Sequence, residues 1–199
     1  IINHYILCER SNKMDELKFA VIGNPVSHSL SPDIHLFFAS QFQLERYTYN
    51  KIKSNENDFE RDINDFFNNG GVGLNVTVPF KGLAYNLCDE LDQSAGLCKS
   101  VNTVLIDSGK LIGHSTDGQG LIDDFLHKEI TLEDSKILII GAGGSAASII
   151  SSLLSHGKIK EISILNRTKS NALRLLDLFE TNRLLMHEEG DEYDIVINT

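Results

Sequence analysis

The sequence is poor in cysteine, lacks a long apolar run and carries fewer basic than acidic residues. Its three cysteines, Cys8, Cys88 and Cys98, form no C-x-x-C pair and leave an odd count, which argues against a disulfide framework and favours a reducing, cytoplasmic location. No apolar stretch is long enough to span a bilayer, and no internal repeat is visible. The formal net charge of -10 argues against a nucleic-acid or anionic-membrane partner.

The chain of 199 residues is 41% hydrophobic and 23% charged, proportions typical of a globular protein with one or two domains. Apolar segments alternate with segments of helical periodicity, which predicts strand–helix–strand units and an α/β fold with mostly parallel sheets. Strands are expected at residues 19–23, 47–52, 74–78, 100–106, 110–113, 136–141, 161–166 and 194–199. Helices are expected within 29–42, with Ser31 as the N-cap, and at 57–69, 80–91, 119–128, 145–157 and 170–181.

This pattern divides the chain into four expected segments. They are an N-terminal extension over 1–18, a substrate domain over 19–117, a connecting helix and turn over 118–135, and a dinucleotide-binding domain over 136–199. The head lacks the basic region and cleavage site of a secretory signal, and Met14 precedes a natural start of the fold. Because the last residues, DIVINT, are typical of a strand, we expect the second domain to be truncated here.

The second half carries a glycine loop in ILIIGAGGSA. Gly141, Gly143 and Ala146 follow the G-x-G-x-x-G/A spacing, which serves a tight turn, close approach of a pyrophosphate and close helix packing. The helix start offers N–H groups and a positive dipole end to phosphates. Because an apolar strand precedes the loop and a helix follows it, a binding loop is favoured over an ordinary glycine turn. The expected cofactor-binding residues here are Gly141, Ala142, Gly143, Gly144, Ser145 and Ala146.

The end of the next strand indicates which dinucleotide binds. NAD sites usually have Asp or Glu about 20 residues after the glycine loop, to bond the ribose 2′-hydroxyl. This sequence has Asn166, Arg167, Thr168 and Lys169 instead, with no carboxylate. A guanidinium donates to a 2′-phosphate in a planar fork, and Lys169 adds a second positive charge. The four residues therefore predict NADP, against the alternative of a solvated charge at a strand end.

In the first half, GLNVTVPFK places polar groups in an apolar strand. Asn75 and Thr77 are two residues apart, so on a strand they would share one face, with Pro79 ending the strand before Lys81. Hydride transfer between an alcohol and nicotinamide needs a group that takes or returns the hydroxyl proton, and a lysine can serve. A lone lysine is usually solvated, so the spacing by itself leaves both interpretations open.

Six motifs occur in order along the chain, namely GNPVSHSLSP, NVTVPFK, SVNT, STDGQG, GAGGSA and NRT. In this combination residues 19–199 resemble the shikimate/quinate dehydrogenase family. The resemblance implies an N-terminal substrate domain and a C-terminal Rossmann-like NADP domain, with the active site in the cleft between them. It also implies reduction of 3-dehydroshikimate to shikimate in chorismate and aromatic amino-acid biosynthesis. The implied partner is this small-molecule substrate, and a homodimer is one option.

The resemblance assigns roles to individual residues. The implied substrate-binding set is Ser29, Ser31, Asn75, Thr77, Lys81, Asn102 and Asp117. The two serines would hold the substrate carboxylate, Asn102 the ring hydroxyls, and Lys81 and Asp117 would be the catalytic pair. No metal is implied. Without the resemblance, the serines are equally typical of helix capping and Asn102 of a turn.

Two positions depart from the family pattern, and they keep alternatives open. Ser115 stands where the family usually has Asn, and Asn171 where many members have a second arginine near the 2′-phosphate. Two other functions remain beside an NADP-dependent shikimate dehydrogenase. One is a quinate/shikimate dehydrogenase that uses NAD or NADP, and the other is a non-catalytic binding protein.

Overall fold

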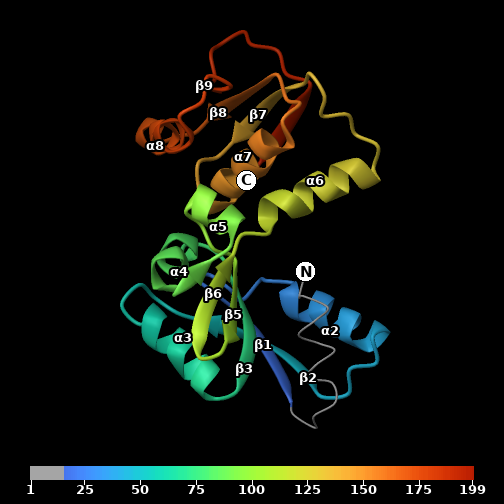
Figure 1. Ribbon diagram of the computed structural model, residues 1–199, viewed down its shortest axis with the longest axis vertical. Coiled ribbons are helices and arrows are strands. Elements are labelled where there is room, and N and C mark those ends of the chain that lie inside the picture. Colours follow the sequence, from blue (N-terminus) through green and yellow to red (C-terminus); the bar gives the residue numbers. More distant parts are fainter. Residues whose placement is uncertain (1–15) are drawn as a thin grey trace. The chain divides into compact units, whose positions relative to one another are not determined.

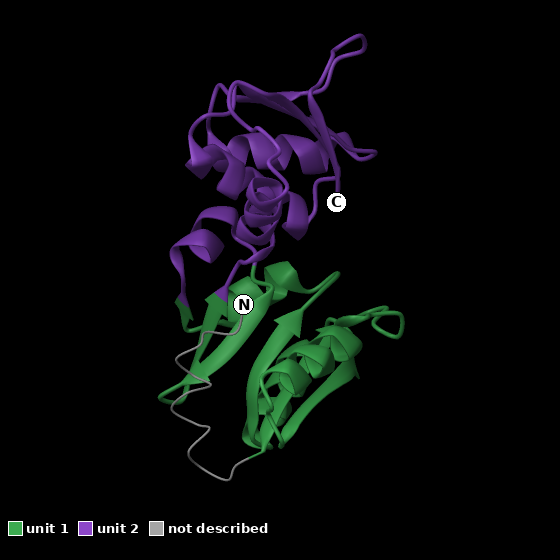
Figure 2. Cartoon of the chain, turned by 90° about the vertical axis from the view of Figure 1, so that its right-hand side faces the viewer, with its two compact units in different colours: residues 1–90, 101–113 green, residues 91–100, 114–199 purple. Residues whose placement is uncertain are grey.

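The computed structural model describes residues 16–199, so residues 1–15 of the expected extension lie outside the described residues (Figure 1). The chain separates into two compact units (Figure 2). Unit 1 comprises the described residues up to 90 together with residues 101–113, and unit 2 comprises residues 91–100 and 114–199. Each unit has its own sheet and helices, so each is described separately.

Unit 1 is built on three parallel strands, β1 (Leu17–Gly23), β2 (Tyr47–Lys53) and β3 (Gly71–Val76). The connections are α2 (Ser31–Gln41), which packs on β1 and β2, and α3 (Phe59–Asn68), which packs on β3. Figure 1 shows these two helices on either side of β1. Because helices cover both faces, β1 is buried along nearly its whole length.

The sheet continues beyond β3 with antiparallel and short elements. Its full order is β2-β1-β3-β5-β6-β4, and β3 pairs antiparallel with β5. The strands added to the sheet are β4 (Glu90–Leu91), β5 (Thr103–Asp107) and β6 (Lys110–His114). Helix α4 (Lys81–Leu87) lies between β3 and β4 in the sequence. The expected turn at DSGK therefore joins β5 and β6.

Unit 2 contains a parallel sheet of order β10-β7-β8-β9. Its strands are β7 (Lys136–Ile140), β8 (Glu161–Leu165), β9 (Leu184–Met186) and β10 (Ile195–Asn198). Its helices are α5 (Gln93–Cys98), α6 (Asp117–His127), α7 (Gly144–His156) and α8 (Lys169–Phe179). The order reverses between β10 and β7, which is where open α/β sheets bind ligands.

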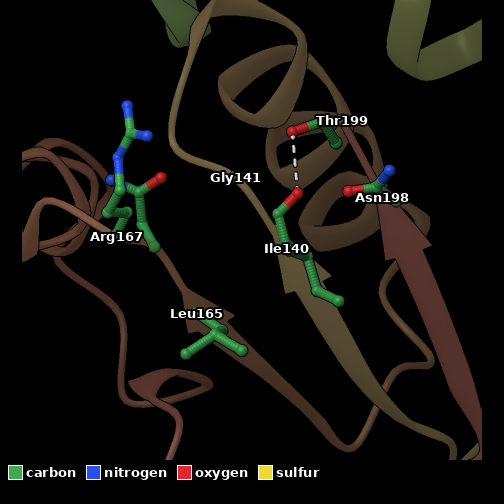
Figure 3. A pocket seen from close by; sticks show the side chains of 7 residues that line it. Ile140, Gly141, Leu165, Arg167, Asn198 and Thr199 are labelled. Carbon is green, nitrogen blue, oxygen red and sulfur yellow. Dashed lines mark hydrogen bonds between the residues drawn. The ribbon is translucent and has the colours of Figure 1, made fainter.

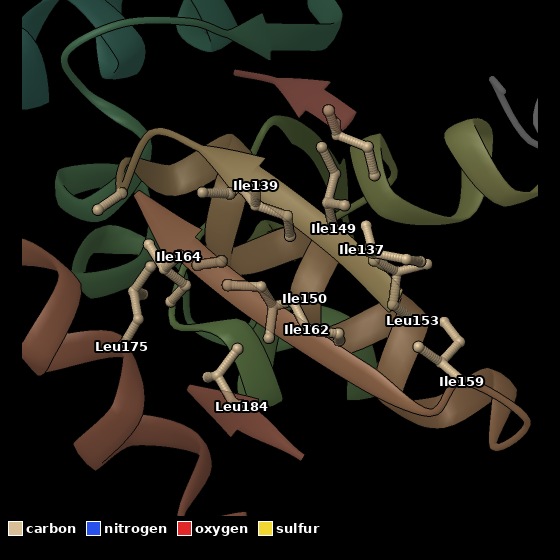
Figure 4. Close-up of a cluster of buried hydrophobic side chains, with 14 of the residues drawn as sticks. Ile137, Ile139, Ile149, Ile150, Leu153, Ile159, Ile162, Ile164, Leu175 and Leu184 are labelled. Atoms are coloured by element: carbon tan, nitrogen blue, oxygen red, sulfur yellow. The ribbon is translucent and has the colours of Figure 1, made fainter. Parts of the chain in front are cut away.

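Apolar side chains on one face of this sheet form the core of unit 2. Ile137 and Ile139 of β7 and Ile162 and Ile164 of β8 are fully buried, and Figure 4 shows them packed with side chains that include Ile150 of α7. Burying such side chains contributes about 1.5–3 kcal/mol each. This core fixes β7 and α7, the two elements that flank the glycine loop.

The structure corrects several expected boundaries. Helix α2 begins at Ser31 itself, with Leu30 at the N-cap, so Ser31 is not the capping residue. Strand β3 begins at Gly71 and ends at Val76, so Thr77 is the first residue after the strand. The helix expected at 80–91 ends at Leu87. The sequence pattern predicted neither α5 nor the three-residue strand β9.

Candidate functional site

In unit 1, backbone hydrogen bonds join the carboxyl end of β1 and the residue after it to the residues that follow β3. The N–H of Thr77 donates to the carbonyl of Ile22 at 3.0 Å, and the N–H of Asn24 donates to the carbonyl of Val78 at 2.9 Å. Gly23 lies so close to the Thr77 side chain that a Cβ there would collide with it. The loop after β1 and the turn after β3 therefore form one edge, at the end of the strands where α/β sheets bind ligands.

Four of the expected substrate residues lie along a row of polar contacts at this edge. Ser29 Oγ donates to Ser31 Oγ at 3.1 Å, and Ser31 lies beside the Tyr49 hydroxyl. Tyr49 Oη donates to Asn75 Oδ1 at 2.6 Å. Asn75 Nδ2 then donates to the Asn102 carbonyl at 3.4 Å and to Thr103 Oγ1 at 3.1 Å. These contacts extend from the serine loop to the segment of Asn102, and they include two residues that the sequence did not indicate, Tyr49 and Thr103.

Burial shifts the pKa values of two aromatic side chains at this edge, Tyr49 and His35. Tyr49 is 5% exposed, and burial raises the pKa of its hydroxyl well above the usual value. The ring of Tyr49 stacks on His35 of α2 at a centroid distance of 4.3 Å. Burial also lowers the pKa of His35, so the neutral ring is favoured. His35 therefore supports the Tyr49 ring.

Lys81 is the first residue of α4, and its backbone is held close to the Asn102 segment. The N–H of Val101 donates to the Lys81 carbonyl at 3.0 Å, and the N–H of Val76 donates to the Asn102 carbonyl at 2.8 Å. Phe80, beside Lys81, is 1% exposed. These contacts fix the backbone from which Lys81 extends, next to the strand that carries Asn75.

Asp117 belongs to unit 2, where it is the first residue of α6. A carboxylate at a helix N-terminus is stabilised by the helix dipole. The departing residue Ser115 is buried, and its hydroxyl donates to Ser148 Oγ at 2.8 Å, while Cys98 Sγ lies 3.3 Å from Ser115 Oγ. Ser115 therefore tethers the segment that leads to Asp117 to helix α7.

The glycine loop has the conformation that its spacing predicts. Gly141 has φ +125, a value that L side chains rarely adopt, and a Cβ there would collide with Thr199. Gly143 is the N-cap of α7, and nothing lies within 4 Å of where its Cβ would be. Ala142 and Ala146 are buried. The open side of Gly143 leaves room for a phosphate at the N-terminus of a 13-residue helix.

A pocket of about 690 Å³ lies at the carboxyl ends of β7, β8 and β10. Its lining residues are Ile140, Gly141, Leu165, Asn166, Arg167, Asn198 and Thr199. Figure 3 shows Arg167 and Thr199 on either side of Gly141. The Thr199 hydroxyl donates to the Ile140 carbonyl at 3.2 Å, and Asn166 Nδ2 donates to the Thr168 carbonyl at 2.8 Å. These contacts hold the two loops that border the pocket.

Some of the expected cofactor-binding residues line this pocket. Gly141, Asn166 and Arg167 line it, whereas Thr168 and Lys169 are exposed outside its lining and Ala142 and Ala146 face the core. The sequence did not indicate Ile140, Leu165, Asn198 or Thr199, although strand ends beside a glycine loop were a usable signal. No group of three potential metal-ligating side chains occurs within residues 16–199, and none of the helices described is long and apolar enough to cross a membrane.

Unit 2 thus has the features of a dinucleotide-binding domain. Its sheet order reverses next to the glycine loop, and a guanidinium lies after the neighbouring strand. Together with the polar edge of unit 1, these features define a nucleotide-dependent oxidoreductase of the α/β class.

Comparison with known proteins gives the family. Residues 21–104 match the shikimate dehydrogenase substrate binding domain and residues 125–199 match shikimate / quinate 5-dehydrogenase. The chain is 41% identical to the NADP(+) shikimate dehydrogenase of Acinetobacter baumannii over 188 residues, 91% of this chain and 71% of that protein. The chain belongs to the shikimate dehydrogenase family, as the resemblance predicted.

Solved structures agree with this assignment. Shikimate 5-dehydrogenase from Thermus thermophilus, in complex with NADP(H) and shikimate, is 31% identical with a TM-score of 0.82, over 92% of this chain and 68% of that one. Shikimate dehydrogenase from Aquifex aeolicus is 29% identical with a TM-score of 0.83, again over 92% and 68%. The predicted α/β fold with a Rossmann-like second domain is therefore confirmed.

Proposed function

We propose that this protein is an NADP-dependent shikimate dehydrogenase, which interconverts 3-dehydroshikimate and shikimate in chorismate and aromatic amino-acid biosynthesis. The observation that carries the proposal is the polar set Ser29, Ser31, Asn75 and Asn102 at the carboxyl edge of the unit 1 sheet, in which Ser29 bonds to Ser31 and Asn75 bonds to the Asn102 carbonyl. These are the side chains for which the family resemblance implies contacts with the carboxylate and hydroxyls of the substrate. The relationship to curated NADP(+) shikimate dehydrogenases supports the same reaction.

The residues of unit 2 suit NADP as cofactor. Arg167 lines the pocket after β8, where a 2′-phosphate would accept its planar fork of donors. The N-terminus of α7 and the open side of Gly143 suit the pyrophosphate. When bound, NADP accepts the hydride from the substrate carbinol carbon or returns it. Lys169, next to this pocket in sequence, supplies a second positive charge.

Lys81 and Asp117 are the residues that we assign to proton transfer. As the alcohol is oxidised, its hydroxyl proton must pass to a base, and a neutral Lys81 amine would accept it. The Asp117 carboxylate would stabilise the ammonium that results. In the reverse reaction the protonated lysine gives the proton back to the carbonyl oxygen. Thr77 completes the proposed lining of the substrate site, and the division into a substrate and a cofactor domain stays part of this proposal.

The direct test is absorbance at the nicotinamide band. The full-length protein is mixed with shikimate or quinate, and with NADP or NAD. Reduction only with shikimate and NADP supports the proposal, equal rates with quinate or NAD support a dual-specificity quinate/shikimate dehydrogenase, and no reduction supports a binding protein. A cytoplasmic location fits the free thiols of Cys88 and Cys98. The homodimer stays a prediction, which light scattering would test.

A further inference from the structure

We propose that Tyr49 is a positioning residue for the substrate. It fixes the side-chain amide of Asn75 so that the hydrogen-bonding capacity left for a ligand is an acceptor. This inference rests on the proposed function, because it takes Asn75 to contact the substrate.

The sheet register brings Tyr49 to Asn75. Tyr49 of β2 is paired with Phe19 of β1, and Asn75 of β3 is paired with Val21. Phe19 and Val21 are two residues apart on one strand, so all these side chains lie on the same face. Helix α2 packs over β2, where His35 stacks on the Tyr49 ring. This stacking holds the ring in place.

Counting donors fixes the direction of every bond. The Asn102 carbonyl only accepts, so the Asn75 nitrogen must face it and Oδ1 must face Tyr49. Oδ1 has no proton, so Tyr49 donates its single proton there. Ser29 donates to Ser31. Both protons of the Asn75 amide are used, toward Asn102 and Thr103.

The directions of these hydrogen bonds determine which ligand groups Asn75 can bind. Asn75 keeps one free lone pair on Oδ1, so it recognises a hydroxyl that donates and offers nothing to a carbonyl or an ether. A carboxylate bound at the serines takes their protons, and Tyr49 still donates to Asn75. Carboxylate binding therefore leaves the Asn75 amide in place.

The test replaces Tyr49 by phenylalanine, which fills the same space and can stack on His35. Asn75 Oδ1 then loses its donor at a partly buried site. Loss of one partner in a buried pair predicts a rise in the KM for shikimate of roughly 5- to 50-fold. Because substrate and transition state lose the same support, kcat should change by less than about threefold, and the KM for NADP should stay unchanged.

Tyr47→Phe is the matched control. Tyr47 lies on the same face of the same strand, and its hydroxyl lies 3.4 Å from His35 Nδ1, away from Asn75. Its KM for shikimate should equal that of the wild type. Thr103→Val removes the acceptor on the other side of the Asn75 amide, so it should also raise the KM for shikimate. It replaces Tyr49→Phe as the test variant if Tyr49→Phe lowers the yield of folded protein.

A double-mutant cycle separates positioning from a structural role. If Tyr49 acts through Asn75, adding Tyr49→Phe to Asn75→Ala should change KM by less than about twofold. A full multiplicative effect in that background, or a KM within twofold of wild type for Tyr49→Phe alone, would overturn the inference. A lower melting temperature with unchanged KM would also overturn it. A wild-type protein that fails to oxidise shikimate with NADP would overturn the proposed function, and this role with it.

Discussion

The side-chain hydroxyl of Ser148, in helix α7, accepts a hydrogen bond at 3.0 Å from the backbone N–H of Gly118, one residue after Asp117. The Ser115 hydroxyl donates to the same oxygen at 2.8 Å. A Cβ on Gly118 would collide with the backbone carbonyl of Ser148. The start of α6 therefore fits against the dinucleotide-binding helix only with glycine at this position, and the backbone of Asp117 is set by that fit.

Replacing Gly118 by alanine should lower the free energy of unfolding and the activity together. Overpacking of a close contact typically costs about 1–3 kcal/mol, and the shift that relieves it moves Asp117. Gly120→Ala is the control in the same helix, since nothing lies within 4 Å of its Cβ position. It should be neutral or stabilising by about 0.5–1 kcal/mol. Urea denaturation and kcat/KM of both variants test this, and equal stability of the two would refute the fit described here.

The role of Ser115 shows what sequence reasoning could and could not supply. The motif comparison identified Ser115 as a departure from Asn. It could not reveal that the hydroxyl is buried against Ser148, because residues 115 and 148 are brought together only when α6 and α7 pack. A short hydroxyl fits between these closely packed segments.

Lys81→Met should remove proton transfer and keep most of the side chain's bulk. General acid–base groups contribute typically ~10²–10⁴-fold, so kcat for shikimate oxidation should fall by that range with a modest change in KM. Asp117→Asn should also lose activity. The double variant should lose much less than the product of the single losses, because the two groups act as one unit.

Lys110→Met is the control for the loss of one lysine in unit 1. Lys110 is exposed and pairs with Glu90 at 2.6 Å, so its removal should leave kcat unchanged. Steady-state kcat and KM for shikimate oxidation, measured across pH, distinguish proton transfer by Lys81 from substrate binding. A Lys81→Met enzyme with raised KM and intact kcat would show that Lys81 only binds the substrate.

Arg167→Ala should weaken NADP far more than NAD. A charge-assisted hydrogen bond contributes about 1.5–3 kcal/mol, so the dissociation constant for NADP should rise by the corresponding ~10- to 150-fold. Arg174→Ala, an exposed position further along α8, should affect neither cofactor. Fluorescence titration of the reduced cofactors measures both. Equal losses for NADP and NAD would mean that Arg167 does not recognise the 2′-phosphate.

Local sequence patterns predicted the parts of the fold that depend on neighbours in the chain. The apolar strand before Gly141 and the small-residue helix after it are local, and both were found. Tyr49 shows the limit. On β2 the tyrosines read as the apolar half of an alternating strand, and their pattern says nothing of Asn75, 26 residues away. That contact depends on the pairing of β1 with both β2 and β3.

Alkaline pH should destabilise the fold through Tyr47. Burial raises the pKa of Tyr47 from 10.0 to about 12, so the folded protein keeps this proton where the unfolded chain releases it. Stability is therefore fully present below pH 10 and is lost as pH rises toward 12. Unfolding free energies measured across this range should fall less steeply in Tyr47→Phe than in wild type. Parallel slopes would contradict the raised pKa of this phenol.

The two glycines of the cofactor loop should respond to alanine in opposite ways. Gly141→Ala meets a strained φ of +125 and a collision with Thr199, so it should lower the melting temperature. Gly143→Ala meets no protein atom within 4 Å, and its φ of -91 suits any residue. That variant should fold with wild-type stability, while its new methyl group occupies the space where the pyrophosphate would approach.

Thermal unfolding with and without NADP separates the two effects. Wild type should gain stability from NADP as expected for a ligand that binds the folded state. Gly143→Ala should keep the wild-type melting temperature without cofactor and lose the gain with it. If Gly143→Ala binds NADP as wild type does, the phosphate does not lie over Gly143. If Gly141→Ala is as stable as wild type, the loop can relax away from Thr199.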